Sequence, residues 1–364
     1  MNEKVKLNQN QLTLLITNLL VVKMIFAFPR NMFKTSGNAA WIEAIYLTVI
    51  AFILLNVTFL TYSRTGNRSI IQLAEYIGKK PLKILVSLVV TVIISGFLCT
   101  EVRTFAESVK IILLPSTKIE HIMLLFAITA GIGAFYGLEA LAIINAIFFP
   151  FCLFFLAVLV LWLVPNFEIN NIMPLFGLGA KNIFGQGLTN LSCFGDILAL
   201  NLLLPYCDNI EMVKKSGRAS VLIAGAMLLS ITLAYGLLYP YPHSSDFLLT
   251  AYQLSRMVRA GEYFQRFEAL FELVWTGTHL LYSAIYIYII CTVLKDGFKL
   301  KYTKPIIPCV VIILAMISFE PSSIIDLLSV SSKIKQMFFP FAYILPILIP
   351  VIFALKRRNS NEKT

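Results

Sequence analysis

Residues 191–196 read Leu191-Ser192-Cys193-Phe194-Gly195-Asp196 and lie near the start of an apolar run that continues to residue 206. A glycine beside an aspartate in such a run indicates a break in a helix, and it predicts that Asp196 caps the half-helix that follows. A break of this kind exposes backbone carbonyls that bind cations and N–H groups that bind a carboxylate. The stretch therefore predicts a discontinuous membrane helix with a ligand site at its break.

A second irregular apolar run lies near the N-terminus. The segment Val21-Val22-Lys23-Met24-Ile25 places a lysine midway along this run, and Pro29 follows it. A charge at the centre of a bilayer costs at least about 2.5–3.5 kcal/mol, so Lys23 is expected to face a cavity, a carboxylate or freed backbone carbonyls. The alternative is that its long stem carries the ammonium to the membrane surface.

The composition is that of a membrane protein. Hydrophobic residues make up 58% of the 364 residues and charged residues only 13%, which excludes an ordinary cytosolic enzyme. A spanning helix needs about 20 apolar residues. By that measure the chain has about ten spans, at roughly 11–33, 39–61, 82–108, 119–137, 141–165, 188–206, 217–241, 265–294, 304–319 and 335–355. We expect one all-α transmembrane domain that covers residues 1–364.

The loop between the fifth and sixth spans, 166–190, separates two halves of five spans each, 11–165 and 188–355. Spans 1 and 6, the two irregular ones, then occupy corresponding positions, as in transporters built from inverted repeats. Between spans 7 and 8, residues 246–262 have the spacing of an amphipathic helix. That segment is either an external gate or an interfacial helix with no gating role.

The net charge of +11 is unevenly distributed between the loops. Most of the Lys and Arg residues fall on one side of the membrane if the N-terminus is cytoplasmic, and the tail 356–364 adds more to that side. The positive-inside rule then predicts that both termini are cytoplasmic. The basic side faces anionic lipid in this orientation, so nucleic acid is not an expected partner.

Span 3 contains three charged residues. Arg103 and Glu107 are four residues apart and can form an ion pair on one helix face. Glu101 points to a different face and needs another partner. Structural pairing and contact with a substrate are both compatible with this pattern.

Span 8 carries a polar and aromatic stripe. Its members recur at spacings of three and four residues and lie within about 40° of one line along the helix; they are Glu268, Glu272, Trp275, His279, Tyr282 and Tyr286. Placing this face against lipid is costly. The stripe either lines an internal crevice or packs against polar groups of a neighbouring helix.

No enzyme or metal motif is present. The six cysteines form no Cys-x-x-Cys pair, and the three histidines lack ligand spacing, so neither a metal nor a cofactor is expected. There is no Walker sequence, and no paired catalytic aspartates or Gly-x-Ser nucleophile occur at a usable spacing. We therefore do not expect an enzyme.

Several short motifs occur in a fixed order along the chain. They are Phe28-Pro29-Arg30, Arg103-Thr104-Phe105-Ala106-Glu107, Leu113-Leu114-Pro115-Ser116-Thr117, Tyr136-Gly137-Leu138-Glu139-Ala140, Phe194-Gly195-Asp196 and Arg266-Phe267-Glu268-Ala269-Leu270-Phe271. In this order they resemble the spore germination permeases, the B subunits of nutrient germinant receptors in endospore-forming bacteria. That family belongs to the amino acid/polyamine/organocation (APC) transporter superfamily.

The resemblance implies a LeuT-like fold with an inverted 5+5 repeat and a site for a small nutrient, such as an amino acid, between spans 1 and 6. Spans 3 and 8 would form its walls. The expected ligand-binding residues are Lys23, Met24, Glu101, Arg103, Phe194, Gly195, Asp196, Glu272 and His279. Structural or gating roles are expected for Pro29, Glu107, Glu139, Arg266, Glu268, Tyr282 and Tyr286. The implied partners are A-type and C-type receptor subunits, and the implied location is the spore inner membrane or cell membrane.

The chain departs from the family pattern at three places. Span 1 has no glycine at Val22-Lys23-Met24, no arginine follows Glu139 closely, and Asp196 replaces a longer glutamate. A lysine in span 1 either favours an anionic group of the ligand or takes the place of a coupling cation. The alternative function is a secondary-active permease for amino acids or polyamines, because the two functions share one scaffold.

Overall fold

A computed structural model describes residues 6–62, 65–258 and 266–361. All regular structure in these ranges is helical. The α-helices are α1 (Gln9–Ile25), α2 (Phe28–Ser36), α3 (Ala40–Tyr62), α4 (Ile70–Ile112), α5 (Ile119–Leu163), α6 (Ala180–Phe184), α7 (Leu198–Leu203), α8 (Ile210–Leu238), α9 (Thr250–Arg256), α10 (Phe267–Phe298), α11 (Ile307–Phe319) and α12 (Ile324–Asn361). The 3₁₀ helices are η1 (Gly37–Ala39), η2 (Val164–Asn166), η3 (Ile169–Ile172), η4 (Gln186–Ile197), η5 (Leu204–Tyr206), η6 (His243–Ser245) and η7 (Lys304–Ile306).

The predicted all-α membrane fold is confirmed. Seven segments of the described chain are long and apolar enough to cross a membrane: Phe28–Tyr62, Ile70–Ile112, Ile119–Asn166, Ala180–Tyr206, Ile210–Leu238, Phe267–Phe298 and Ile324–Arg358. Lys304–Phe319 is a shorter apolar helix. The predicted spans 119–137 and 141–165 form the single element α5, which is interrupted where Gly137 has φ +87°. The chain is therefore a multi-pass membrane protein.

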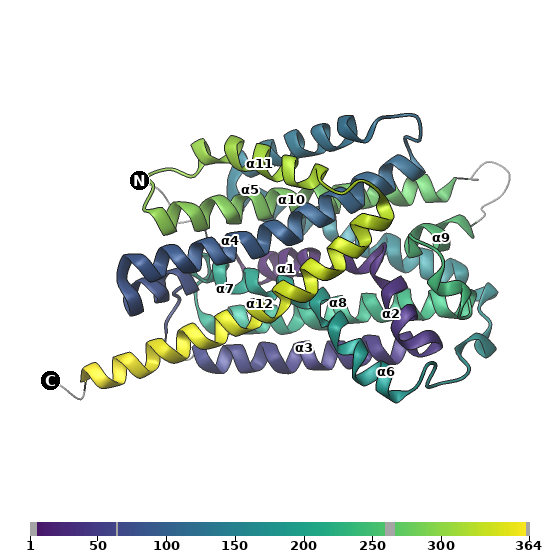
Figure 1. The fold of residues 1–364 in the computed structure, drawn as a ribbon, viewed down its shortest axis with the longest axis horizontal. Coiled ribbons are helices and arrows are strands. Elements are labelled where there is room, and N and C mark those ends of the chain that lie inside the picture. The colour runs from purple at the N-terminus through teal and green to yellow at the C-terminus, as the bar shows by residue number, and fades with distance from the viewer. Residues whose placement is uncertain (1–5, 63–64, 259–265, 362–364) are drawn as a thin grey trace.

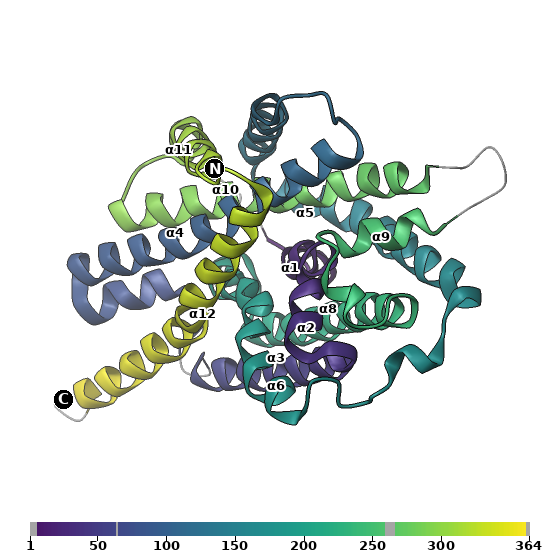
Figure 2. The same ribbon diagram turned by 45° about the vertical axis from the view of Figure 1, so that its right-hand side comes forward.

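Helix α1 lies inside the bundle, and its neighbours include α8, α5 and η4 (Figures 1 and 2). From Leu15 to Ile25 every residue of α1 is buried. Helices α3 and α5 instead expose large apolar side chains, such as Leu60 and Ile147, on the outside of the bundle. An apolar exterior around a helix that is buried on all sides is the arrangement expected in lipid.

Both described ends of the chain lie toward the same end of the long axis (Figure 1). That the two termini face the same side of the membrane stays a prediction from the charge distribution. The cytoplasmic assignment of that side is a prediction of the same kind, and the residue limits of the two halves and of the basic tail stay predictions as well.

The connections differ from the expected loops. The segment 166–190 contains η3, α6 and the first residues of η4, so much of it is helical and not an open loop. In 246–262 the expected amphipathic helix is shorter and consists of α9, Thr250–Arg256. The end of that expected segment, 259–262, lies outside the described residues.

The segment 173–179 packs against the turn between α2 and α3 through a glycine. Gly177 has φ +46°, and a Cβ there would lie 2.0 Å from the carbonyl oxygen of Ser36. Gly179 also has a positive φ, +103°, but nothing lies within 4 Å of a Cβ added there. The two glycines can be compared, because both have a positive φ and only Gly177 would also meet a steric clash.

We expect Gly177→Ala to lower the melting temperature of the purified protein by several degrees more than Gly179→Ala does. The reason is that the first change forces the segment off α2, whereas the second adds backbone strain alone, roughly 1–3 kcal/mol, because Gly179 has φ +103° and ψ 155°. Differential scanning fluorimetry measures both shifts. Equal shifts would contradict the close approach between Gly177 and Ser36.

Candidate functional site

The first predicted span, 11–33, is interrupted between two helices. Helix α1 ends at Ile25, and α2 begins at Phe28 with Pro29 in its first turn. Proline has no N–H and is tolerated in a first turn, so Pro29 fixes the start of the new helix. The break leaves Lys23 in the last turn of α1.

The predicted sixth span, 188–206, is irregular in a different way from the one expected. Residues Gln186–Ile197 form the 3₁₀ helix η4, which continues into α7 at Leu198. The residue before α7 is Ile197, and no side chain caps that helix. The prediction that Asp196 caps a half-helix is therefore wrong. The backbone does not open at Gly195, so its N–H groups need no cap, and the Asp196 carboxylate binds other groups.

Asp196 forms a fully buried ion pair with Lys23. The Lys23 Nζ lies 2.5 Å from the Asp196 Oδ2, and both side chains are 0% exposed. The hydroxyl of Tyr286 donates to Oδ1 at 2.6 Å. The ammonium also lies 3.5 Å from the carbonyl oxygen of Ser192 and 4.8 Å from the centre of the Phe97 ring. This cluster joins α1, η4 and α10 at one point, and Asp196 is a carboxylate partner of the kind expected among the alternatives for Lys23.

A second ion pair joins α4 to α12. The Lys335 Nζ lies 2.5 Å from the Glu101 Oε1, and the two side chains are 12% and 5% exposed. Glu101 therefore has the separate partner expected of it. Lys335 was expected to be the first residue of the predicted span 335–355. Helix α12 instead begins at Ile324, so this lysine lies well inside the helix.

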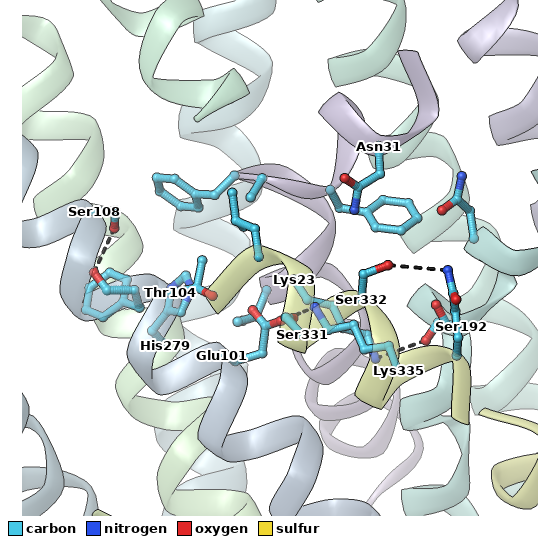
Figure 3. Close-up of a pocket in the computed structure, with 18 residues that line it drawn as sticks. Lys23, Asn31, Glu101, Thr104, Ser108, Ser192, His279, Ser331, Ser332 and Lys335 are labelled. Atoms are coloured by element: carbon cyan, nitrogen blue, oxygen red, sulfur yellow. Dashed lines mark hydrogen bonds and ion pairs between the residues drawn. The ribbon is translucent and has the colours of Figure 1, made fainter. Parts of the chain in front are cut away.

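A pocket lies beside these ion pairs, and Lys23, Glu101 and Lys335 belong to its lining (Figure 3). Its lining comes from the α1–α2 break, from α4, η4 and α10, and from the first turns of α12. The lining residues are Val22, Lys23, Phe26, Ala27, Phe28, Asn31, Glu101, Thr104, Phe105, Ser108, Asn190, Ser192, His279, Leu328, Ser331, Ser332, Lys335 and Gln336. We call this the central pocket.

The charges around the central pocket balance. Lys23 and Lys335 contribute two positive charges, and Glu101 and Asp196 contribute two negative charges. Each charge is already paired, which reduces the cost of its burial. A ligand that carries one charge of each sign can replace a pair without adding net charge to this buried region.

The polar stripe of α10 faces the interior. Glu272, Trp275, His279, Tyr282 and Tyr286 are all buried. The Glu272 Oε1 accepts a hydrogen bond of 2.6 Å from Ser108, which lines the central pocket. His279 lines the pocket directly, stacks on Phe105 at 4.2 Å between ring centres, and has Nδ1 3.2 Å from the Trp275 carbonyl oxygen. Five of the six residues of the predicted stripe are thus buried in the bundle, and Glu268, at the start of α10, is partly exposed.

Other expected ligand residues lie outside the pocket lining. Met24, Phe194 and Gly195 are buried in the core beside it, and a Cβ on Gly195 would lie 3.2 Å from the Phe97 ring. Arg103 forms the expected ion pair with Glu107, 2.9 Å long. That pair turns Arg103 away from the pocket toward the Met123 sulfur, 3.7 Å away.

Three residues expected to have structural or gating roles lie near helix ends or breaks. Glu139 is exposed, two residues after the break at Gly137. Arg266, with a side chain 69% exposed, precedes α10 and lies 3.5 Å from Glu268. Its guanidinium also donates to the carbonyl oxygen of Ile112 at 3.1 Å.

Glu43 is a buried polar residue that the sequence interpretation missed. It is 0% exposed in α3 and accepts hydrogen bonds from Ser36 at the end of α2 and from Asn190 in η4, the latter at 2.7 Å. Because Asn190 also lines the central pocket, Glu43 ties the two irregular crossings together beside it. The signal was present, since Glu43 is a carboxylate inside the apolar run 39–61.

No group of three or more His, Cys, Asp or Glu side chains suited to a metal ion occurs in the described part of the chain. Within the same residues the six cysteines are free, and Cys309 alone among them is exposed.

Two irregular crossings that meet at a polar pocket inside a helical bundle define a protein with the fold of LeuT-type transporters. Two solved structures share this fold. MhsT in complex with L-phenylalanine matches with a TM-score of 0.70 over 95% of this chain and 89% of that one. The nucleobase-cation-symport-1 family transporter Mhp1, closed with bromovinylhydantoin bound, matches with a TM-score of 0.64 over 89% of this chain and 74% of that one. Both are 14% identical to this chain, so the likeness concerns the fold.

The chain belongs to the spore germination protein family of permeases, whose model matches residues 6–326. It is 25% identical to spore germination protein A2 of Bacillus subtilis (strain 168) over 98% of both chains. It is 22% identical to spore germination protein B2 of the same organism over 75% of this chain and 74% of that one. The resemblance stated from the motifs is confirmed.

Proposed function

We propose that this protein is a non-enzymatic, ligand-sensing subunit of a spore germinant receptor and that it binds a small nutrient in the central pocket. The observation that carries the proposal is the charge-balanced pocket beside the α1–α2 break and η4, with paired charges of both signs on its walls. An amino acid suits these charges. Its carboxylate can pair with Lys335 and its ammonium with Glu101, so that the ligand replaces the ion pair between the two side chains.

The Glu101–Lys335 pair supplies the link from binding to signalling. A zwitterion that inserts between these two side chains separates α4 from α12. Any ligand changes a conformational equilibrium only through a difference in its affinity for the two states. Here that difference arises because the bound state replaces one ion pair between helices with two pairs to the ligand.

The same proposal includes the assembly. Through α12 the change passes to partner subunits of the A and C types, in the spore inner membrane, with both termini cytoplasmic. The basic loops and tail then lie beside anionic lipid headgroups. Membership of a germination family supports this assignment.

A binding measurement with matched ligands tests the site. The purified subunit in nanodiscs is titrated with the twenty amino acids, and each binder is compared with the amine that lacks its carboxylate and the acid that lacks its ammonium. We expect only the zwitterion to bind, with each analogue weaker by at least about tenfold, or 1.4 kcal/mol. Equal binding of the amine or the acid would contradict the two-charge site.

The second candidate function is a secondary-active permease for amino acids or polyamines. It is favoured by the two solved structures that share the fold, one a named transporter and the other holding an amino acid. Reconstitution of the subunit alone in liposomes separates the candidates. Uptake of the bound nutrient against its gradient would support the permease, and binding without uptake would support the sensor.

The position of the central pocket leads to a labelling prediction. We expect cysteines at Ser332 or Gln336, in a Cys309→Ser background, to react with a water-soluble maleimide more slowly when a zwitterionic nutrient is bound. Both residues line the pocket. A cysteine at Lys333, which is exposed on the same helix but does not line the pocket, serves as the control. Protection of the control position as well would point to a general change and not to occupancy.

A further inference from the structure

A second cavity lies on the other side of α12. Its walls come from α4 at Gly96 and Cys99, from the end of α11 at Ile317, and from α12 at Leu327 and Val330. None of these residues lines the central pocket. The first turns of α12 therefore separate two hollows, and we call the second one the α12 cavity.

The interior of the α12 cavity is apolar in practice. Its small polar side chains already have partners, since Ser318 donates to the Leu314 carbonyl oxygen at 2.8 Å and Thr100 donates to that of Gly96 at 3.0 Å. The Cys99 thiol also points to the Leu314 carbonyl oxygen, 3.5 Å away. An apolar ligand body placed here breaks no hydrogen bond, so its burial is favoured by roughly 25 cal/mol per Å² of apolar surface removed from water.

Two carboxylates, Glu320 and Asp326, belong to the same lining. Both are exposed, and neither forms an ion pair within the described residues. The Asp326 carboxylate accepts only long hydrogen bonds of 3.4 Å, from the N–H and hydroxyl of Ser322 just before α12. An apolar cavity with two uncompensated negative charges complements a molecule that has an apolar body and a cationic end.

We propose that the α12 cavity is a binding site for a small amphipathic amine. Its apolar body fills the space between Cys99, Ile317 and Val330, and its ammonium lies between the carboxylates of Glu320 and Asp326. Neutral and anionic molecules of the same size bind less well, because they leave the two carboxylates without a counter-charge.

Binding in this cavity also affects the central pocket, a part of the proposal that rests on the proposed function. Leu327 and Val330 face the α12 cavity, whereas Leu328 and Ser331 line the central pocket. The cavity is walled by both α4 and α12, so an occupant packs against the two helices at their present spacing, and these contacts are lost when α12 separates from α4. The amine therefore holds the central pocket closed.

The first experiment measures binding alone. The full-length subunit in phosphatidylcholine nanodiscs is titrated with n-hexylamine, hexan-1-ol and hexanoate, and the melting temperature is followed. We expect saturable stabilisation by hexylamine and at least tenfold weaker binding of the other two. Glu320→Gln/Asp326→Asn should weaken hexylamine binding at least tenfold, and Val330→Trp should abolish it by filling the cavity. Glu120→Gln, which changes an exposed carboxylate on α5, is the control.

Shifts that do not saturate, or that are the same in all four proteins, would show partition into the bilayer and overturn the site. This experiment uses no nutrient, so a negative result would not contradict the proposed nutrient site in the central pocket.

The second experiment measures the coupling between the two hollows. The maleimide reaction of a cysteine at Gln336 is timed with and without saturating hexylamine, in the Cys309→Ser background. We expect the reaction to slow at least threefold, and we expect no slowing in the Val330→Trp variant. An unchanged rate in the presence of bound hexylamine would overturn the coupling while leaving the binding site in place.

Discussion

Lys23→Met is expected to abolish the nutrient response and to lower the free energy of unfolding by about 3–5 kcal/mol. The substitution leaves the Asp196 carboxylate inside the bundle with the Tyr286 hydroxyl but without its cation. An unpaired buried charge costs far more than the ion pair contributes, because the desolvation of the remaining carboxylate is no longer offset. Melting temperature and nutrient binding of the purified subunit measure the two effects.

Lys6→Met is the matched control for this change. Lys6 also forms an ion pair, 2.8 Å from Asp208, but the two side chains are 69% and 53% exposed. Water replaces the partner there, so we expect almost no change in melting temperature. The double variant Lys23→Met/Asp196→Asn should recover most of the lost stability, because it removes both charges and keeps an acceptor for Tyr286. Equal shifts for Lys23→Met and Lys6→Met would contradict the buried pair.

The second large effect is expected from reversing one charge at the side of the pocket. Lys335→Glu places a carboxylate against Glu101, where the present pair has its atoms 2.5 Å apart. Repulsion should separate α4 from α12, speed the labelling of a cysteine at Gln336 several-fold, and weaken nutrient binding at least tenfold, or about 1.4 kcal/mol. The ligand loses its cationic partner and meets a second negative charge.

The swap Glu101→Lys/Lys335→Glu restores the pairing with exchanged partners. It should return the labelling rate to near the original value, whereas Lys333→Glu, an exposed change on the same helix, should leave it unaltered. If Lys333→Glu had the same effect as Lys335→Glu, net charge on α12 would explain the result without an ion pair to α4.

Much of the site follows from the rule that polar groups inside a membrane need partners. The rule selects Lys23, Glu101 and Asp196 from the sequence, and it places the stripe of α10 in the interior. It does not say which helices are neighbours. Lys335 and Glu101 are 234 residues apart, and only the packing of α12 on α4 brings them together.

The failures have physical causes. Hydropathy locates only the apolar part of a helix, so the polar first turns of α12, which line the pocket, were assigned to a loop. Asp196 was expected to cap a helix because a glycine beside an aspartate resembles an N-terminus. The backbone satisfies its own hydrogen bonds there by tightening into a 3₁₀ helix, and local sequence does not distinguish these two solutions.

The length of η4 has a mechanical consequence. A 3₁₀ helix rises about 2.0 Å per residue and an α-helix about 1.5 Å, and η4 spans 12 residues. Rewinding the whole segment as α-helix would shorten it by about 6 Å and change its turn count from about 4 to about 3.3. A change between the two helix types in η4 would therefore move α7 along the helix axis and rotate it, and no open loop would be needed for that movement. Asp196 lies one residue before the end of η4, so such a rewinding would rotate its side chain about the helix axis. The ion pair between Asp196 and Lys23 would oppose that rotation.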